Sequence, residues 1–98
     1  MSRRPNILFL MTDQMQGQTL RSDHPCMTPN LDKLAAKGVR FDRAYTPNAI
    51  CSPARASLMT GLRPDTLDMH TLKHELRDKN PDVVTLGQLF RRNGYFSA

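Results

Sequence analysis

Tryptophan is absent from the sequence, cysteine occurs only twice, and no long hydrophobic run is present. Two cysteines cannot build the disulfide framework of a small secreted domain, and neither has a partner at zinc-finger spacing. The apolar run before Asp13 is shorter than a signal peptide's hydrophobic region (roughly 7–15 residues) and than a membrane span (about 20 residues). We therefore expect a cytoplasmic protein with no membrane partner.

Basic residues exceed acidic ones, 14 against 9, which gives a net charge of +5. An excess of this size would permit anion or nucleic-acid binding. The basic residues are dispersed, however, and no long basic run is interleaved with aromatic residues. We interpret the charge mostly as solvated surface and expect no nucleic-acid partner.

Three segments have strand-like patterns. Residues 6–12 form a near-continuous apolar run, as in strands buried on both faces of a parallel sheet. Residues 39–45 alternate between apolar and polar, which predicts a half-exposed strand or an extended segment. The final residues, 95–98, look like the beginning of a third strand.

Three helices are predicted between and after these segments. Residues 29–38 begin with Pro29 after a potential cap, Thr28, and end at Gly38 in the left-handed position after the helix. Residues 53–61 form a short helix with Ser52 as N-cap and Gly61 in the left-handed position after it. Residues 83–94 are amphipathic, with Thr85 as a potential cap. The stretch between the last two, residues 62–82, is predicted to be an irregular polar excursion that contains one helical turn.

Alternating strands and helices predict an α/β fold with a parallel sheet. Two or three strands cannot cover both faces of such a sheet. We therefore expect residues 1–98 to be the N-terminal piece of one larger domain.

The stretch "NAICSPARASLMTG" places Cys51 just before a helix and Arg55 in its first turn. Unpaired N–H groups and the helix dipole attract anions there, and a guanidinium matches a tetrahedral oxyanion. The spacing excludes the C-x5-R loop of cysteine phosphatases, because Ser57 stands where the arginine would be. Two interpretations remain open from the residues alone: a sulfate or phosphate pocket, and a plain cysteine beside a capped helix.

The stretch "CSPARASLMTG" resembles the signature of the sulfatase family, C-x-P-x-R followed by a short helix and Thr-Gly. The resemblance covers essentially the whole chain, through "RPNILFLMTDQ", "TPNLDKLAAKGVRFDRAYT", "GLRPDT" and "VVTLGQLFRRNGYFSA". It implies the N-terminal part of an alkaline-phosphatase-like α/β/α sandwich with a largely parallel sheet.

The resemblance also implies site residues. Cys51 would be converted by a separate formylglycine-generating enzyme to formylglycine, whose hydrate attacks sulfur, and would also be a metal ligand. Arg55 would be the positive group beside it. Asp13 and Gln14 would bind one divalent cation, with calcium expected first and magnesium or manganese as alternatives.

Some positions depart from the family pattern or lack an obvious role. Gln14 stands where the family often has a second aspartate, so it would bring an oxygen but no charge. Asp-Gln also occurs in the branch with choline-sulfatase-like enzymes and phosphonate or phosphodiester hydrolases, whereas the region after "GLRPDT" resembles iduronate-sulfatase-like members. His70 and His74 are expected to be surface or substrate-rim residues, and Cys26 a free thiol.

Our hypothesis is a sulfuric-ester hydrolase acting on a sulfate-ester small molecule or a sulfated sugar. The alternatives are a phosphonate monoester or phosphodiester hydrolase of the same fold, and a non-catalytic domain that binds anions. The resemblance places the remaining active-site residues beyond position 98. The isolated chain is therefore expected to be inactive.

Overall fold

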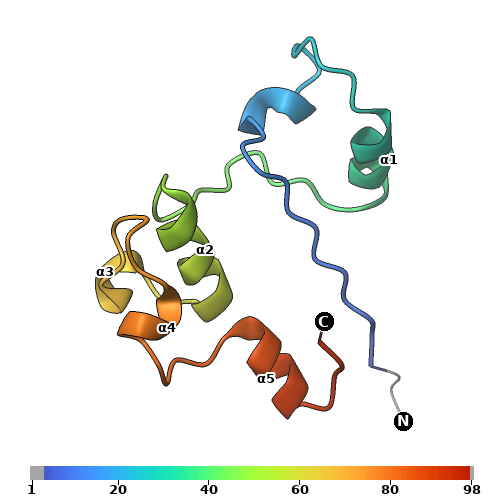
Figure 1. The fold of residues 1–98 in the computed structure, drawn as a ribbon. Coiled ribbons are helices and arrows are strands. Elements are labelled where there is room, and N and C mark those ends of the chain that lie inside the picture. Colours follow the sequence, from blue (N-terminus) through green and yellow to red (C-terminus); the bar gives the residue numbers. More distant parts are fainter. Residues whose placement is uncertain (1–3, 98) are drawn as a thin grey trace. The chain divides into compact units, whose positions relative to one another are not determined.

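The computed structural model describes residues 4–97, and all the regular secondary structure in this range is helical (Figure 1). The elements in chain order are a 3-10 helix η1 (Gly17–Leu20), α1 (Pro29–Lys37), α2 (Cys51–Thr60), α3 (Pro64–Leu67), α4 (Leu76–Lys79) and α5 (Leu86–Arg92). The described residues fall into two compact units, one ending at Asp42 and the other beginning at Arg43. None of the helices described is long and apolar enough to cross a membrane.

The predicted helices α1 and α5 are confirmed. Thr28 makes no side-chain capping bond at the start of α1, and Gly38 has φ −132°, so the predicted left-handed conformation of Gly38 is wrong. Helix α1 begins at Pro29 directly after Thr28, and helix α5 begins after Thr85. The backbone N–H of Thr85 donates to Oε1 of Gln88 at 2.9 Å. This bond satisfies a donor at the helix start that has no partner within the helix.

The predicted strand over residues 6–12 does not form, because these residues have no regular secondary structure. The side chains predicted to be buried are exposed, Leu8 by 82% and Leu10 by 75%. A strand needs a neighbouring strand to pair its backbone groups, and residues 4–97 supply none. The α/β sheet predicted from the sequence is therefore not present in this part of the protein.

The second predicted strand, over residues 39–45, is interrupted by a turn at Asp42 and Arg43. The guanidinium of Arg40 donates to Asp42 Oδ1 at 2.8 Å and to the carbonyl oxygen of Leu20 at 3.1 Å. The first bond lies within the segment, and the second joins the segment to the end of η1. The alternating pattern thus marks an irregular segment in this structure.

The third predicted strand does not form: residues 95–97 have no regular secondary structure and follow the end of α5, and the last residue, Ala98, lies outside the described residues. Gly94 has φ 79°, a left-handed conformation that suits glycine. Its N–H donates to the carbonyl of Arg91 at 3.0 Å, and that of Tyr95 to the carbonyl of Phe90 at 3.1 Å. The rings of Phe90 and Tyr95 pack edge to face with centroids 5.1 Å apart. Together these contacts form a Schellman motif, in which Tyr95 closes the helix.

The excursion, residues 62–82, contains the two short helices α3 and α4 rather than a single turn. Lys79 forms an ion pair with Asp68, and the side-chain amide of Asn80 donates to the carbonyl oxygen of Leu67 at 2.8 Å. Both contacts connect the end of α4 to the end of α3. The excursion is thus closed into a loop by contacts between the ends of its two helices.

The core of the second unit lies between α2 and this excursion. Leu67 and Met69 are each only 1% exposed, and Ala56 of α2 is 6% exposed. Leu76 and Val83 pack against these three residues. Burial of these apolar side chains fixes the excursion against the helix that carries Cys51.

Candidate active site

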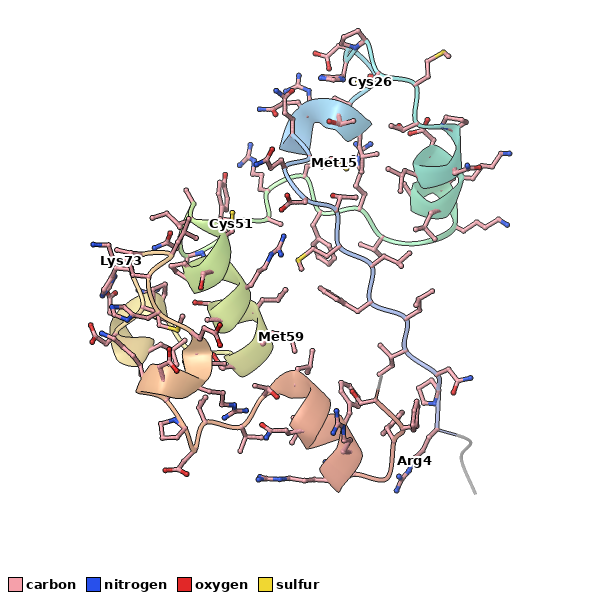
Figure 2. All side chains as sticks on the ribbon, in the orientation of Figure 1. Arg4, Met15, Cys26, Cys51, Met59 and Lys73 are labelled. Carbon is pink, nitrogen blue, oxygen red and sulfur yellow. The ribbon has the colours of Figure 1, made fainter. Side chains whose placement is uncertain are left out.

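Cys51 occupies the first position of α2, two residues earlier than the predicted helix start (Figure 2). The N-cap is Ile50, so the prediction of Ser52 as N-cap is wrong. The side-chain oxygen of Asn48 accepts the Ile50 N–H at 2.7 Å and shapes the turn that leads into the helix. A proline is tolerated at position 53, within the first turn of α2, because the backbone N–H that proline lacks would have no partner within the helix there.

The N-terminal end of α2 is suited to binding an anion. The N-cap side chain makes no capping hydrogen bond, and an isoleucine side chain has no acceptor to offer. The N-terminal N–H groups and the helix dipole therefore favour negative charge beside Cys51.

Arg55 lies four residues after Cys51, so the two side chains share one face of α2. Both residues are exposed. The sequence predicted Cys51 just before a helix with Arg55 in its first turn, whereas Cys51 is itself the first residue of α2. A guanidinium is a side chain whose geometry matches a tetrahedral oxyanion.

A pocket of about 440 Å³ lies beside this helix face. Cys51, Ser52 and Arg55 line it from α2, together with residues of the excursion that include Met69 and Glu75. This pocket could not be predicted from the sequence, because the excursion has no regular pattern of apolar residues. The one signal available was the set of apolar residues within that polar stretch.

Asp13 and Gln14, the predicted metal ligands, belong to the first unit, whereas Cys51 and Arg55 belong to the second. Both ligands are exposed, and Gln14 has φ 53°. A left-handed conformation is uncommon for glutamine and is found mostly at sites where the surrounding structure requires it. Within residues 4–97 no three His, Cys, Asp or Glu residues gather as a metal site.

The two histidines considered in the sequence are exposed. Nε2 of His70 lies 3.9 Å from a carboxylate oxygen of Asp65. Nothing in the described range brings His70 and His74 together as part of a metal cluster.

Cys26 is a free, exposed thiol, as predicted. It lines a second pocket of about 390 Å³ in the first unit, next to His24 and Arg21. The Arg21 guanidinium hydrogen-bonds and attracts Asp23, and so lowers the pKa of that carboxyl.

The sulfatase family model matches residues 5–98, which is nearly the whole chain. The chain belongs to the sulfatase family. Similar sulfatases include a sulfatase of Formosa agariphila, 36% identical over 96% of this chain, and the iduronate 2-sulfatase of Mus musculus, 34% identical over 92%. The choline-sulfatase of Rhizobium meliloti is 38% identical over 97% of the chain.

The chain spans only 20%, 16% and 18% of the length of these three sulfatases, respectively. The matched part contains Cys51, Arg55, Asp13 and Gln14. All four predicted site residues thus lie in the region that this chain has in common with the sulfatase family.

Proposed function

We propose that this chain is the N-terminal part of a sulfuric-ester hydrolase with an alkaline-phosphatase-like α/β/α catalytic domain. The observation that carries the proposal is the placement of Cys51 at the first position of α2, with Arg55 one turn later, in a chain of the sulfatase family. The full-length protein would supply the strands that pair with residues 6–12. It would also supply the remaining active-site groups.

Cys51 is proposed to be the precursor of formylglycine, which supplies a hydrated aldehyde as nucleophile toward sulfur. The start of α2 holds the anionic oxygens of the ester through its backbone N–H groups. Arg55, on the same face, pairs with those oxygens and orients the sulfate group toward position 51. These residues bind and orient the ester rather than transfer protons.

Asp13 and Gln14 are proposed to bind one divalent cation, calcium first and magnesium or manganese as alternatives, together with residue 51. Their carboxylate and amide oxygens are the kind of donor that hard cations prefer. Two oxygens are fewer than the 6–8 that calcium takes, so ligands from elsewhere in the full-length protein are required. When bound, the cation would stabilise negative charge at the reacting group.

The names of the relatives indicate the substrate class. One acts on a choline ester and another on iduronate, according to their names, so sulfate esters of small molecules and of sugars both occur among them. We propose a substrate from this class, and a formylglycine-generating enzyme as the partner in maturation.

The test starts with the full-length protein, co-expressed with a formylglycine-generating enzyme. Mass spectrometry of the peptide that contains Cys51 should show loss of one sulfur and two hydrogen atoms and gain of one oxygen. The matured protein should hydrolyse 4-nitrophenyl sulfate, and Cys51→Ala should abolish this activity. An unmodified thiol in active maturation conditions, with no hydrolysis, would show that the protein binds anions without catalysis.

A phosphonate monoester or phosphodiester hydrolase is the second candidate, and Gln14 is the observation that favours it. The pair Asp13-Gln14 resembles the Asp-Gln pair of the family branch that contains phosphonate and phosphodiester hydrolases. The same assay with a phosphodiester and a phosphonate monoester separates the two candidates. Faster turnover of the phosphorus esters would overturn the sulfatase activity.

A further inference from the structure

The side chain of Arg77 fastens the end of the excursion that leads to α5. Nη1 of its guanidinium donates to the carbonyl oxygen of Pro81 at 2.9 Å and to that of Val83 at 2.7 Å. Nη2 donates to Oε1 of Gln88 at 2.9 Å. One side chain of α4 thus joins the turn after α4, the approach to α5 and the first turn of α5.

A guanidinium suits this junction because of its shape. Its donors lie in one plane and point in several directions, whereas a lysine ammonium is a single compact group. All three acceptors of Arg77 are neutral oxygen atoms. Within the part of the chain that the structure describes, Arg77 forms no ion pair. The direction of the donors, rather than the charge, therefore holds the junction together.

The residues beside these bonds pack against the core of the second unit. Leu76 precedes Arg77 in α4, and both Leu76 and Val83 pack against the buried cluster between α2 and the excursion. Because Arg77 ties the Val83 backbone to α4, the two apolar side chains are held against the core together. Without the guanidinium, α4 would keep fewer links to the segment that follows it.

The excursion forms one wall of the pocket beside Cys51, and the opposite wall on α2 includes Met59. The pocket-lining residues of the excursion are Met69, Leu72, Glu75 and Leu76. One end of this wall is fixed at Met69, which is 1% exposed. The other end is the stretch that Arg77 fastens. Residues 70–75 between these two attachments are all exposed, so the position of the wall depends on both ends.

We propose that Arg77 is a positioning residue for the reaction at residue 51. It acts through Leu76, by holding the excursion wall at a fixed distance from α2, and so it sets the width of the pocket. The inference rests on the proposed hydrolase function and adds to it a residue outside the signature stretch 51–61. Loss of the guanidinium should weaken binding of the ester and leave the reacting groups on α2 in place.

Access to residue 51 can be measured without catalysis, on full-length protein made without the formylglycine-generating enzyme. The protein is alkylated with N-ethylmaleimide, and peptide mass spectrometry follows Cys51 and Cys26 separately. In Arg77→Lys, Cys51 should react about twofold to tenfold faster, because the loss of one ordinary hydrogen bond frees the wall to this extent. Cys26, an exposed thiol of the first unit, should react at an unchanged rate and is the control.

Kinetics of the matured protein test the same role with substrate. Arg77→Lys should raise KM for 4-nitrophenyl sulfate by a similar factor and leave kcat unchanged, which is the pattern of a lost binding contribution. Arg92→Lys makes the same exchange at an exposed residue of α5 that does not line the pocket, and it should change neither value. Thermal unfolding establishes that each variant is folded at the assay temperature.

A double variant offers a rescue at the same junction. Arg77→Lys combined with Gln88→Glu gives the ammonium group a carboxylate partner, and glutamate keeps the capping role of Gln88 at the start of α5. KM should return toward that of the unsubstituted protein. A KM as high as that of Arg77→Lys alone would place the cause outside this junction and refute the proposal.

The outcomes separate this proposal from the hydrolase function. Arg77 does not position the pocket wall if Arg77→Lys leaves the alkylation of Cys51 unchanged, or accelerates Cys51 and Cys26 equally. A lower kcat with an unchanged KM would overturn the proposal as well. Absence of hydrolysis in every protein would refute the hydrolase function, while the alkylation rates would still decide the role of Arg77.

Discussion

Gln14 combines an unusual backbone conformation with a side chain that is proposed to bind metal. A substitution by glycine separates the effect of the backbone on stability from the effect of the side chain on metal affinity. Gln14→Gly removes the strain of φ 53°, so we expect the free energy of unfolding to rise by about 0.5–1 kcal/mol in the absence of metal. Calcium affinity of the full-length protein should fall about tenfold, because one oxygen donor is lost. Calorimetric titration and thermal unfolding with and without chelator measure both effects.

Gln14→Asn is the matched variant, since asparagine keeps an amide and tolerates the left-handed conformation. It should retain more of the calcium affinity than the glycine variant. Equal calcium affinity in all three proteins would show that Gln14 is not a ligand.

At the residue scale, the ion pair between Asp68 and Lys79 should make the free energy of unfolding depend on pH. The Lys79 ammonium hydrogen-bonds and attracts the Asp68 carboxylate, which lowers the pKa of Asp68 below its usual 3.8. A lowered pKa in the folded state means that the stabilisation is present above pH 3.8 and is lost as the pH falls through the folded-state pKa. Asp68→Asn should therefore destabilise the protein at pH 7, and the difference should shrink as the pH falls below 3.8.

Chemical unfolding of both proteins between pH 3 and pH 7 measures this difference, with Asp82→Asn as the control for general loss of charge. Asparagine also suits the left-handed φ of 49° at position 68. A stability difference that does not change with pH would contradict the ion pair as its cause.

At the scale of the element, the end of α2 depends on one glycine. Gly61 has φ 72°, and its N–H donates to the carbonyl of Ser57 at 2.8 Å. A Cβ at this position meets nothing within 4 Å, so the cost of Gly61→Ala comes from the backbone alone. We expect a loss of about 1 kcal/mol in the free energy of unfolding.

Gly17→Ala is the control for Gly61→Ala, because a Cβ at Gly17 also meets nothing and its φ is not in the left-handed range. Thermal unfolding of the full-length protein compares the two variants. A loss of stability as large in Gly17→Ala as in Gly61→Ala would show that the left-handed backbone of Gly61 is not the cause of the loss.

Helices could be predicted from the sequence where the signals are local. Pro29, Thr85 and Gly61 mark helix ends through bonds and dihedral angles within a few residues, and the structure confirms all three. The start of α2 was missed because Ile50 is not a capping residue. The signal was two residues before Ile50, in the side chain of Asn48.

The strands and the pocket could not be predicted in this way, because both depend on distant partners. Residues 6–12 have a strand-like composition, but a ladder requires another strand, and the described residues provide none. Met69 and Leu76, which line the pocket, are placed by the core around Leu67. Cys51 and Arg55 could be proposed as site residues because their spacing is local and matches a family signature.

At the scale of the whole molecule, apolar side chains on the surface predict how the isolated chain behaves. Large hydrophobic residues of both units are exposed, including Leu8 by 82%, Phe41 by 78% and Phe96 by 95%. Exposed apolar surface of this extent is a site for further protein contacts. The 98-residue chain expressed alone should therefore bind the dye ANS and hydrolyse no sulfate ester.

This expectation is checked by measuring ANS fluorescence with the isolated chain and with the full-length protein. Only the isolated chain should increase the fluorescence. Leu8→Lys combined with Leu10→Lys should reduce the signal of the isolated chain. Full sulfatase activity in the isolated chain would contradict the proposal that further active-site residues are needed.

The two thioethers in the pocket wall have a consequence for handling the protein in the presence of peroxide. Oxidation to the sulfoxide makes methionine polar, and solvent access governs its rate. Met59 is 38% exposed and Met69 only 1%, so Met59 reacts first. Mild oxidation would thus change one wall of the pocket while the core around Leu67 stays intact, and affinity for apolar ligands would decline before the protein unfolds.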